Sequence, residues 1–303
     1  MGKLVLIITI ILSSVMLMEA VVYSDTLLKK AQAGDARSQY DLGTYYLDGE
    51  NSEINIDEGV NWYQKSAAQG YAPAEYELAI CYEHGFGVVQ SEAEAVKWFK
   101  KSAEHNDAKA QSTLAYRYSI GQGVEKNEAE SDRWRLLSAE NGDAGSQFLL
   151  GLKYFNGYSV PRDLKESMKW CKMAALQGDS EAQIMMGDFY IDAEVVEKNY
   201  PEAVKWYAMS AEQGNVDKQV DLGMMFLYGE GGKIDYQEAY KWFLLQSKRP
   251  GYNGMYDTEL GLAKEKLNQT QIDKAVADVR RIMDKPGFQF PEYDYYDEEY
   301  YDE

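Results

Sequence analysis

Residues 182–214 read AQIMMGDFYIDAEVVEKNYPEAVKWYAMSAEQG, and the tryptophan in this stretch belongs to a periodic series. The chain contains six tryptophans, each 36 residues from the next. They are Trp62, Trp98, Trp134, Trp170, Trp206 and Trp242. Such a period is typical of a supersecondary unit copied in tandem, because one copy cannot bury its apolar face alone. We therefore predict six repeats, at 35–70, 71–106, 107–142, 143–178, 179–214 and 215–250.

Each repeat is predicted to form two helices, A and B. In helix A, apolar or small residues such as Met186, Gly187 and Tyr190 recur at helical spacing. Helix B begins at a short polar residue followed three positions later by glutamate, as at Asn199 and Glu202. This pattern is typical of a capping box, in which the polar side chain accepts a backbone N–H and the glutamate reaches back. The sequence therefore predicts helix–turn–helix units with the tryptophans packed between layers.

The quoted stretch resembles the Sel-one-like repeat (SLR) family, relatives of the tetratricopeptide repeats. The resemblance rests on Ala182, Gln183, Gly187 and Tyr190, and then on EAVKWY at 202–207 and SAEQG at 210–214. It covers residues 24–250. It implies an all-α fold, a right-handed α/α superhelix (solenoid), that acts as an adaptor or scaffold in protein complexes.

Cysteine-rich secreted members of that family carry a disulfide in each repeat, whereas this chain has only Cys81 and Cys171. These two lie two and a half repeats apart. Successive helices pack about 8–10 Å apart, and a disulfide needs Cα atoms within about 7 Å. We therefore expect both thiols to be free and the chain to lie outside the disulfide-bonded branch.

The two ends of the chain differ from the repeats. Lys3 followed by the apolar run 4–18 predicts a signal peptide over residues 1–20 and hence export to the periplasm or secretion, with an uncleaved N-terminal anchor as the alternative. Residues 24–34 and 251–285 are expected to form helical caps, the latter with helices near 257–267 and 270–283. Residues 286–303 are predicted to be a disordered, acidic, tyrosine-rich tail, which either only solvates the chain or recognises a basic surface.

The charge of the chain restricts its partners. The formal net charge is −19, from 50 acidic and 31 basic residues. Such a charge repels phosphate backbones, so we expect no nucleic-acid partner. A basic or amphipathic protein partner fits the charge, although an acidic surface that only keeps the chain soluble is the commoner explanation of such a charge.

The sequence contains no pattern that indicates catalysis. Its histidines, His84 and His105, are 21 residues apart and no paired cysteines accompany them, so no metal set can be assembled locally. His105 falls at the end of a helix B, where the helix dipole favours it. We expect no enzyme activity and no cofactor.

Helix A lines the concave face in tetratricopeptide-like superhelices, so we predict a partner-binding face there in repeats four to six. Its predicted apolar residues are Leu149, Leu152, Met185, Phe189, Met224, Met225 and Tyr228. Its predicted acidic rim consists of Asp188, Asp192, Asp217 and Asp221. Exposed apolar residues rimmed by acid favour an amphipathic basic partner. Alternatively, some of these side chains pack beneath the C-terminal cap.

Two functions fit this prediction. The first is an exported scaffold or adaptor that binds a partner protein on the concave helix-A face. The second is a periplasmic immunity protein that neutralises a basic toxin.

Overall fold

The computed structural model describes residues 25–48, 54–286 and 288–290, and every regular element in these ranges is a helix. Residues 25–32 are helical. The helices that follow are α2 (Ala36–Asp48), α3 (Ile56–Ala67), α4 (Ala72–His84), α5 (Glu92–Glu104), α6 (Ala108–Ile120), α7 (Glu128–Glu140), α8 (Ala144–Asn156), α9 (Leu164–Leu176), α10 (Ser180–Asp192), α11 (Tyr200–Ala211), α12 (Val216–Tyr228), α13 (Tyr236–Gln246), α14 (Asp257–Glu265) and α15 (Gln269–Met283). The chain divides into two compact units, the first ending at Ser146 and the second beginning at Gln147.

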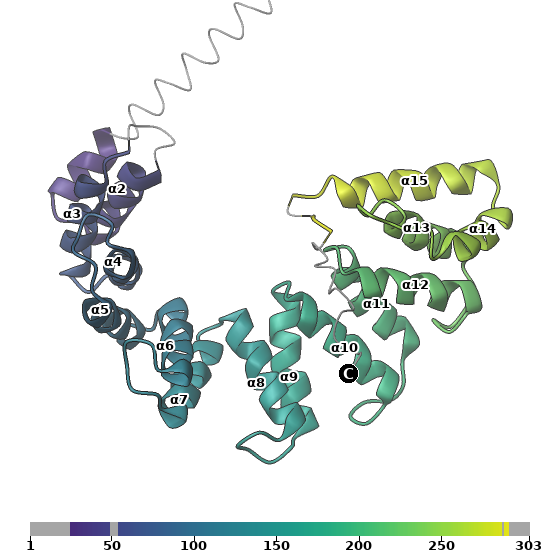
Figure 1. Cartoon of the computed structure of the whole chain (residues 1–303), viewed down its shortest axis with the longest axis horizontal. Coiled ribbons are helices and arrows are strands. Elements are labelled where there is room, and N and C mark those ends of the chain that lie inside the picture. The colour runs from purple at the N-terminus through teal and green to yellow at the C-terminus, as the bar shows by residue number, and fades with distance from the viewer. Residues whose placement is uncertain (1–24, 49–53, 287, 291–303) are drawn as a thin grey trace, which may run out of the picture. The chain divides into compact units, whose positions relative to one another are not determined.

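Within each unit the helices pack as successive hairpins (Figure 1). In the first unit, α2 packs on α3, α4 on α5 and α6 on α7, and α3 and α5 also contact the helix that follows them. In the second unit, α10 packs on α11 and α12 on α13, with further contacts between α9 and α10 and between α11 and α12. The predicted all-α fold of helix–turn–helix repeats is confirmed.

The polar residue before each second helix caps that helix, as predicted. The Oδ1 atom of Asn55, for example, accepts a hydrogen bond from the backbone N of Glu58 at 3.2 Å. The backbone N–H of Asn55 donates to the carbonyl of Tyr46, nine residues earlier, at 2.9 Å. The same backbone bond recurs at Ser91, Asn127, Asp163, Asn199 and Asp235.

The predicted second half of the capping box is wrong for these helices. Because the N-cap N–H already bonds to the preceding helix, the glutamate does not reach back to it. In the second to sixth repeats it pairs instead with a cation one turn on, as Glu94 does with Lys97 at 3.1 Å. Both halves of a capping box are present at α15, between Asn268 and Gln271.

The tryptophans lie in the core, as predicted, with one of them only half-buried. Trp242 is 1% exposed, and the other buried indoles, at 62, 134, 170 and 206, are at most 9% exposed. Trp98 is half-buried. Trp62 shows the arrangement, because it packs with Leu27 and Ala31 of the preceding helix. Trp134 and Trp206 likewise pack with buried residues of the repeat before their own.

The small-residue column of helix A accommodates the residue that follows the tryptophan. A Cβ added at Gly187 would lie 2.2 Å from the Cε1 atom of Tyr207. A Cβ at Gly223 would lie 2.7 Å from the ring of Phe243. Glycine at these positions lets helix A and helix B of one repeat approach across an aromatic ring.

A column of buried glutamines joins consecutive helices through polar contacts. Gln39 donates through Nε2 to the carbonyl of Ala31 at 3.0 Å and accepts at Oε1 from Gln69 at 2.8 Å. In the second repeat this pair is replaced by Glu75, which is 2% exposed, and His105, with 2.7 Å between Oε2 and Nδ1. The prediction that His105 has a structural role therefore agrees with the contact it makes.

The C-terminal part of the second unit covers α13. Ala263 of α14 and Ala275 of α15 are fully buried against Tyr240 and Phe243. The two helices begin and end within a few residues of the predicted ones. They close the apolar end that the last repeat would otherwise expose.

The short segment 288–290 also packs against the second unit. The rings of Phe288 and Phe290 meet edge to face, with 5.1 Å between their centroids, and both pack against the cluster containing Val279 and Ile282. The predicted disordered tail therefore does not begin at 286, because these two rings find an apolar surface. Residues 291–303 and the predicted signal peptide at 1–20 lie outside the described residues.

Candidate partner-binding face

Three of the residues predicted to be exposed on the helix-A face are buried. Met185, Phe189 and Met225 are only 5–8% exposed. The ring of Phe189 lies edge to face on Phe155 of the preceding helix A, with centroids 6.1 Å apart. The expectation of exposure is wrong at these positions because the side chains pack against the preceding repeat.

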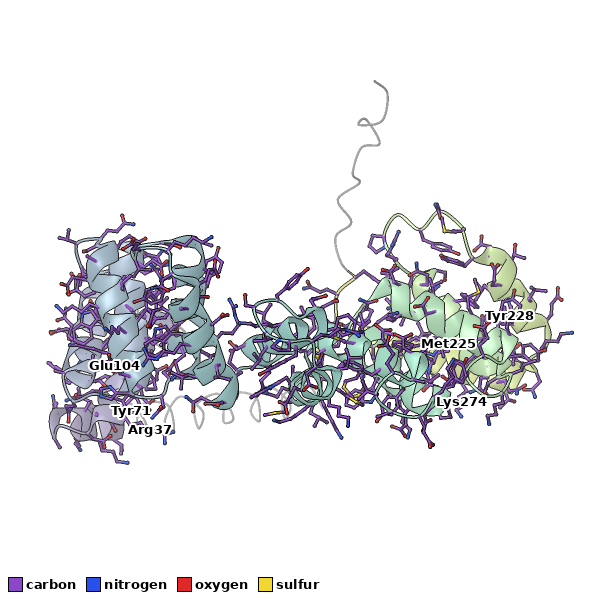
Figure 2. The ribbon with its side chains drawn as sticks, turned by 90° about the horizontal axis from the view of Figure 1, so that it is seen from below. Arg37, Tyr71, Glu104, Met225, Tyr228 and Lys274 are labelled. Atoms are coloured by element: carbon purple, nitrogen blue, oxygen red, sulfur yellow. The ribbon has the colours of Figure 1, made fainter. Side chains whose placement is uncertain are left out.

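The other predicted apolar residues are more accessible. Leu149 is 47% exposed and Tyr228 is 59% exposed. Leu152 and Met224 are partly buried against neighbouring core clusters. Figure 2 labels Tyr228 together with the buried Met225, both of them on α12. Apolar surface on this face is therefore confined to a few separate side chains.

Three of the predicted acidic residues act on one tyrosine. The hydroxyl of Tyr207 donates to Oδ1 of Asp188 at 2.6 Å. Burial raises the pKa of this hydroxyl, and the bond to Asp188 and the charges of Asp221 and Asp192 raise it further. Lys218 lies 2.9 Å from Asp221 and its Nζ lies 4.4 Å from the centroid of the Tyr207 ring. Lys218 thus pairs with Asp221 beside the ring whose hydroxyl bonds to Asp188.

In the first repeat, the position that corresponds to Asp188 carries no carboxylate. There the hydroxyl of Tyr63 lies 3.0 Å from the hydroxyl of Thr44, which occupies the place of Asp188 in its repeat. Burial raises the pKa of the Tyr63 hydroxyl. The acidic character around the tyrosine of helix B therefore belongs to the fifth repeat and not to the first.

A pocket of about 420 Å³ adjoins the same face of α12. Asp217 and Asp221 line it from α12, and Gln246, Arg249 and Tyr256 line it from the end of α13 and the connection to α14. Sequence reasoning identified the two aspartates but not the other three residues. The sequence does contain a signal for two of them, because both differ from the other repeats. The position of Gln246 holds serine or alanine elsewhere, and the position of Arg249 holds glutamine, asparagine or histidine.

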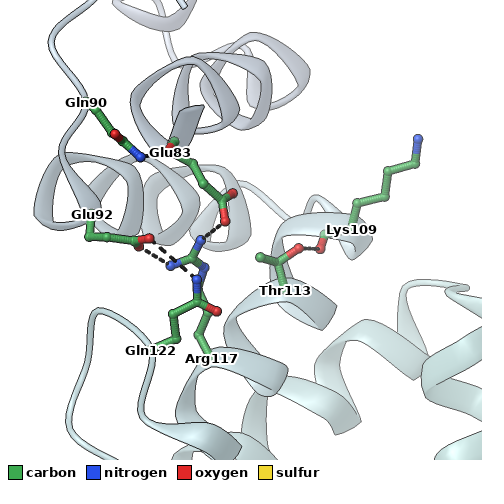
Figure 3. A network of polar contacts seen from close by, with 7 residues as sticks. All are labelled: Glu83, Gln90, Glu92, Lys109, Thr113, Arg117 and Gln122. Atoms are coloured by element: carbon green, nitrogen blue, oxygen red, sulfur yellow. Dashed lines mark hydrogen bonds and ion pairs between the residues drawn. The ribbon is translucent and has the colours of Figure 1, made fainter. Parts of the chain in front are cut away.

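A second polar cluster, in the first unit, serves to join repeats (Figure 3). Arg117 of α6 is 2% exposed, and its guanidinium lies 2.6 Å from Glu83 and 2.7 Å from Glu92. Its charged group also lies 4.9 Å from the ring centroid of Phe99. The hydrogen bond from Arg117 holds the pKa of Glu92 below its usual value. Because Glu83 and Glu92 flank the loop of the preceding repeat, the arginine fixes that loop against α6.

Neither a metal site nor a spanning helix is found in the part of the chain that the structure describes. No three His, Cys, Asp or Glu side chains come together there as they would around a metal ion. None of the helices in the described ranges combines the length and hydrophobicity needed to cross a bilayer. Cys81 and Cys171 are both free and buried.

Comparison with known proteins identifies the repeat. The model of the Sel1 repeat matches residues 36–71, 72–107, 108–143, 144–179, 180–215 and 219–245. A crystal structure of a Sel1 repeat protein from Oxalobacter formigenes is 31% identical with a TM-score of 0.60, and the match covers 71% of this chain and 89% of that one. No curated protein matches the chain significantly.

Two further solved structures are less similar. The protective antigen c5321 of uropathogenic Escherichia coli, which displays an SLR fold, is 26% identical with a TM-score of 0.48, covering 86% of this chain and 64% of that one. The immunity protein PA5088 of Pseudomonas aeruginosa is 18% identical with a TM-score of 0.43, covering 84% of each chain.

Proposed function

Because the chain belongs to the Sel1 repeat family, we propose that it is a non-enzymatic scaffold that binds a basic protein partner on the helix-A face of α10 and α12. The observation that carries this proposal is the group of aspartates on that face. Asp188, Asp192 and Asp221 act on one buried hydroxyl, and Asp217 lies one turn before Asp221. The exposed ring of Tyr228 adds an amphipathic contact on the same helix.

The grouped negative charges on this face favour binding of a partner, whereas they do not stabilise the fold. Like charges grouped on one surface repel each other, and a cationic partner would relieve that repulsion. Complementary charge of this kind accelerates association and sets the choice of partner more than it sets affinity. The net charge of −19 extends the same field over the whole chain.

We propose further that the scaffold acts outside the cytoplasm. The sequence of residues 1–20 supports this, because a lysine precedes a continuous apolar run of signal-peptide length. A signal-peptide fusion assay tests it. Export of a reporter fused after residue 24 supports the proposal, and retention of the reporter in the cytoplasm contradicts it.

The main experiment compares capture of partners from the exported fraction by the unchanged chain and by a face variant. The face variant carries Asp192→Asn and Tyr228→Ala, both at exposed positions. The control carries Glu104→Gln and Glu140→Gln, which remove two exposed acids at the ends of α5 and α7 and so change the net charge more than the face variant does. We expect the unchanged chain and the control to retain the same basic protein, and the face variant to lose it.

Salt gives a second measurement of the same idea. Capture through this face should weaken as the salt concentration rises from 50 to 300 mM, because the Debye length shortens from over 10 Å to below 8 Å. Equal capture by the face variant and the unchanged chain would contradict the proposed face.

The alternative, an immunity protein, would use the same acidic face against a basic toxin. A cell challenged with a toxin encoded beside this chain distinguishes the two. Survival only when the chain is present favours inhibition, whereas retention of several proteins that also bind each other favours a scaffold.

A further inference from the structure

The sixth repeat departs from the others at two positions of helix B. Ser66 donates to the carbonyl of Ala36, and the same bond is made by Ser102 and Ser138 in their repeats. In the sixth repeat, Gln246 occupies this position. Three residues on, Arg249 occupies the position of the glutamine, asparagine or histidine that pairs with helix A in the other repeats.

These departures leave polar groups without their usual partners. Gln246 is 4% exposed, and its Oε1 makes no hydrogen bond with any described residue. The Oε1 of Gln219, which is fully buried, is likewise unpartnered among the described residues. Equivalent oxygens in other repeats accept bonds, as Gln183 does from Gln213 at 2.8 Å. A buried, unpartnered amide oxygen costs about 1–3 kcal/mol and requires an explanation.

Gln246 lines the pocket of about 420 Å³ beside α12, within the size range of about 300–1,000 Å³ that ligand sites occupy. Part of its wall comes from the segment after Pro250, which contributes Tyr252, Asn253, Met255 and Tyr256. Asp217 and Asp221 line one side of it. Tyr252 and Tyr256 line the side formed by the connection to α14.

The lining of this pocket calls for a ligand that donates hydrogen bonds. Two carboxylates and the amide of Gln246 offer acceptors, and Arg249 is the cation among the lining residues. Lys218 already pairs with Oδ2 of Asp221 at 2.9 Å, which leaves Asp217, the second oxygen of Asp221 and Oε1 of Gln246 as acceptors among the described residues. The hydroxyl of Tyr252 already accepts from the backbone N of Tyr256 at 2.9 Å and donates to Asp257 at 3.2 Å. The unmet capacity therefore lies in the acceptors.

We propose that this pocket receives an arginine side chain of the partner protein. This proposal rests on the function proposed above and identifies one contact between the chain and that partner. A guanidinium can donate to a carboxylate and an amide oxygen at the same time, and its plane can lie against a tyrosine ring. The ring of Tyr256 is suited to this role because it is held by Phe243, stacked at 25° with centroids 6.1 Å apart. An ammonium group would satisfy the charge but not the planar contact.

A small-molecule titration tests the pocket without the partner. The full chain is labelled with ¹⁵N on glutamine, and Nα-acetyl-L-arginine amide is added while the side-chain amide signals are recorded. The Gln246 pair is identified by its absence in Gln246→Ser, which restores the residue found in four other repeats. We expect this pair to shift and saturate.

The variant Asp217→Asn/Asp221→Asn should weaken binding of the arginine probe by about tenfold, because two charged acceptors are lost. Glu166→Gln changes a partly exposed acid in the first turn of α9, which does not line the pocket, and should leave binding unchanged. Nα-acetyl-L-norleucine amide should not shift the Gln246 pair at the same ionic strength. Far-UV circular dichroism confirms that each variant remains helical.

Three results would overturn the assignment. The Gln246 pair does not respond to the arginine probe, or norleucine amide shifts it as strongly, or Nα-acetyl-L-glutamate amide binds in its place through Arg249. Because the capture experiment changes Asp192 and Tyr228, which do not line the pocket, its failure is distinct from a failure here.

Discussion

Arg117 allows the packing and the ionic contributions of one buried side chain to be separated. Its guanidinium bridges Glu83 and Glu92, and the side chain is 2% exposed beside Phe99 of the preceding repeat. We compare Arg117→Ala with Arg117→Met. Methionine keeps the volume of the stem, and Met225 is buried at the equivalent position of the sixth repeat.

The expected magnitudes follow from the exposure of the partners. Breaking a fully buried ion pair costs about 3–5 kcal/mol, because the remaining charge is left without solvent. Here the side chains of Glu83 and Glu92 are 22% and 44% exposed, so water can reach both after Arg117 is removed. We therefore expect Arg117→Met to lower the free energy of unfolding by only about 1 kcal/mol, since screened pairs contribute little. Arg117→Ala should cost about 3 kcal/mol, because it also leaves a cavity.

Urea unfolding followed by circular dichroism at 222 nm measures both variants. Arg117→Met combined with Glu92→Gln serves as the control, because it removes the carboxylate that the arginine left behind. If Arg117→Met is as destabilising as Arg117→Ala, the bridge itself and not the packing stabilises this contact, and the reasoning from partner exposure is refuted.

Three further predictions concern the core. The first concerns the pair of Glu75 and His105, in which Glu75→Gln should restore the amide donor found in other repeats. His105→Ala should lower the free energy of unfolding by about 1.5 kcal/mol in the unchanged chain but by about 0.5 kcal/mol when Glu75→Gln is present. Additive effects of the two substitutions in a double-mutant cycle would contradict this. Burial raises the pKa of the Cys81 thiol from 9.0 to about 12, so the folded state holds this proton more tightly and stability is full below pH 9 and is lost as the pH rises towards 12. Between pH 8 and pH 10 this thiol should account for about 1.4 kcal/mol of lost stability. Cys81→Ala should therefore lose less stability over that interval, and an unfolding free energy that falls with pH as steeply as in the unchanged chain would contradict this. Gly187→Ala should lower the unfolding free energy by about 1–3 kcal/mol through overpacking against Tyr207, and a midpoint of thermal unfolding equal to that of the unchanged chain would show that the ring can move aside.

Much of the fold could be predicted from residues whose role is local to one repeat. The tryptophan period gives the number of units, and the polar residue before helix B gives the start of that helix. The caps at Asn55 and Ser91 depend only on the four residues that follow them. The glutamate of the expected capping box was misinterpreted because the N-cap N–H bonds to a carbonyl of helix A, and sequence spacing does not reveal this contact.

The candidate site was harder to predict because exposure depends on neighbouring repeats. Phe189 and Met225 occupy the same register as Arg117, and all three are buried against the repeat before them. A helical pattern places a side chain on a face but does not say whether the next helix covers that face. The pocket at Gln246 was missed for a related reason, since it depends on the path of the chain after Pro250.

The backbone bond between each N-cap and the preceding helix has a consequence for how this chain can vary. It joins the same two positions at 2.9 Å in every repeat, from Asn55 and Tyr46 to Asp235 and Phe226. The connections that it closes differ in sequence, as GFGVVQ at 85–90 and AEVVEK at 193–198 do, although both keep a valine at the fourth position. We therefore expect that one connection can replace another without shifting the two helices that flank it. The bond that holds them uses main-chain atoms, and proline at the N-cap is the one substitution that removes its N–H.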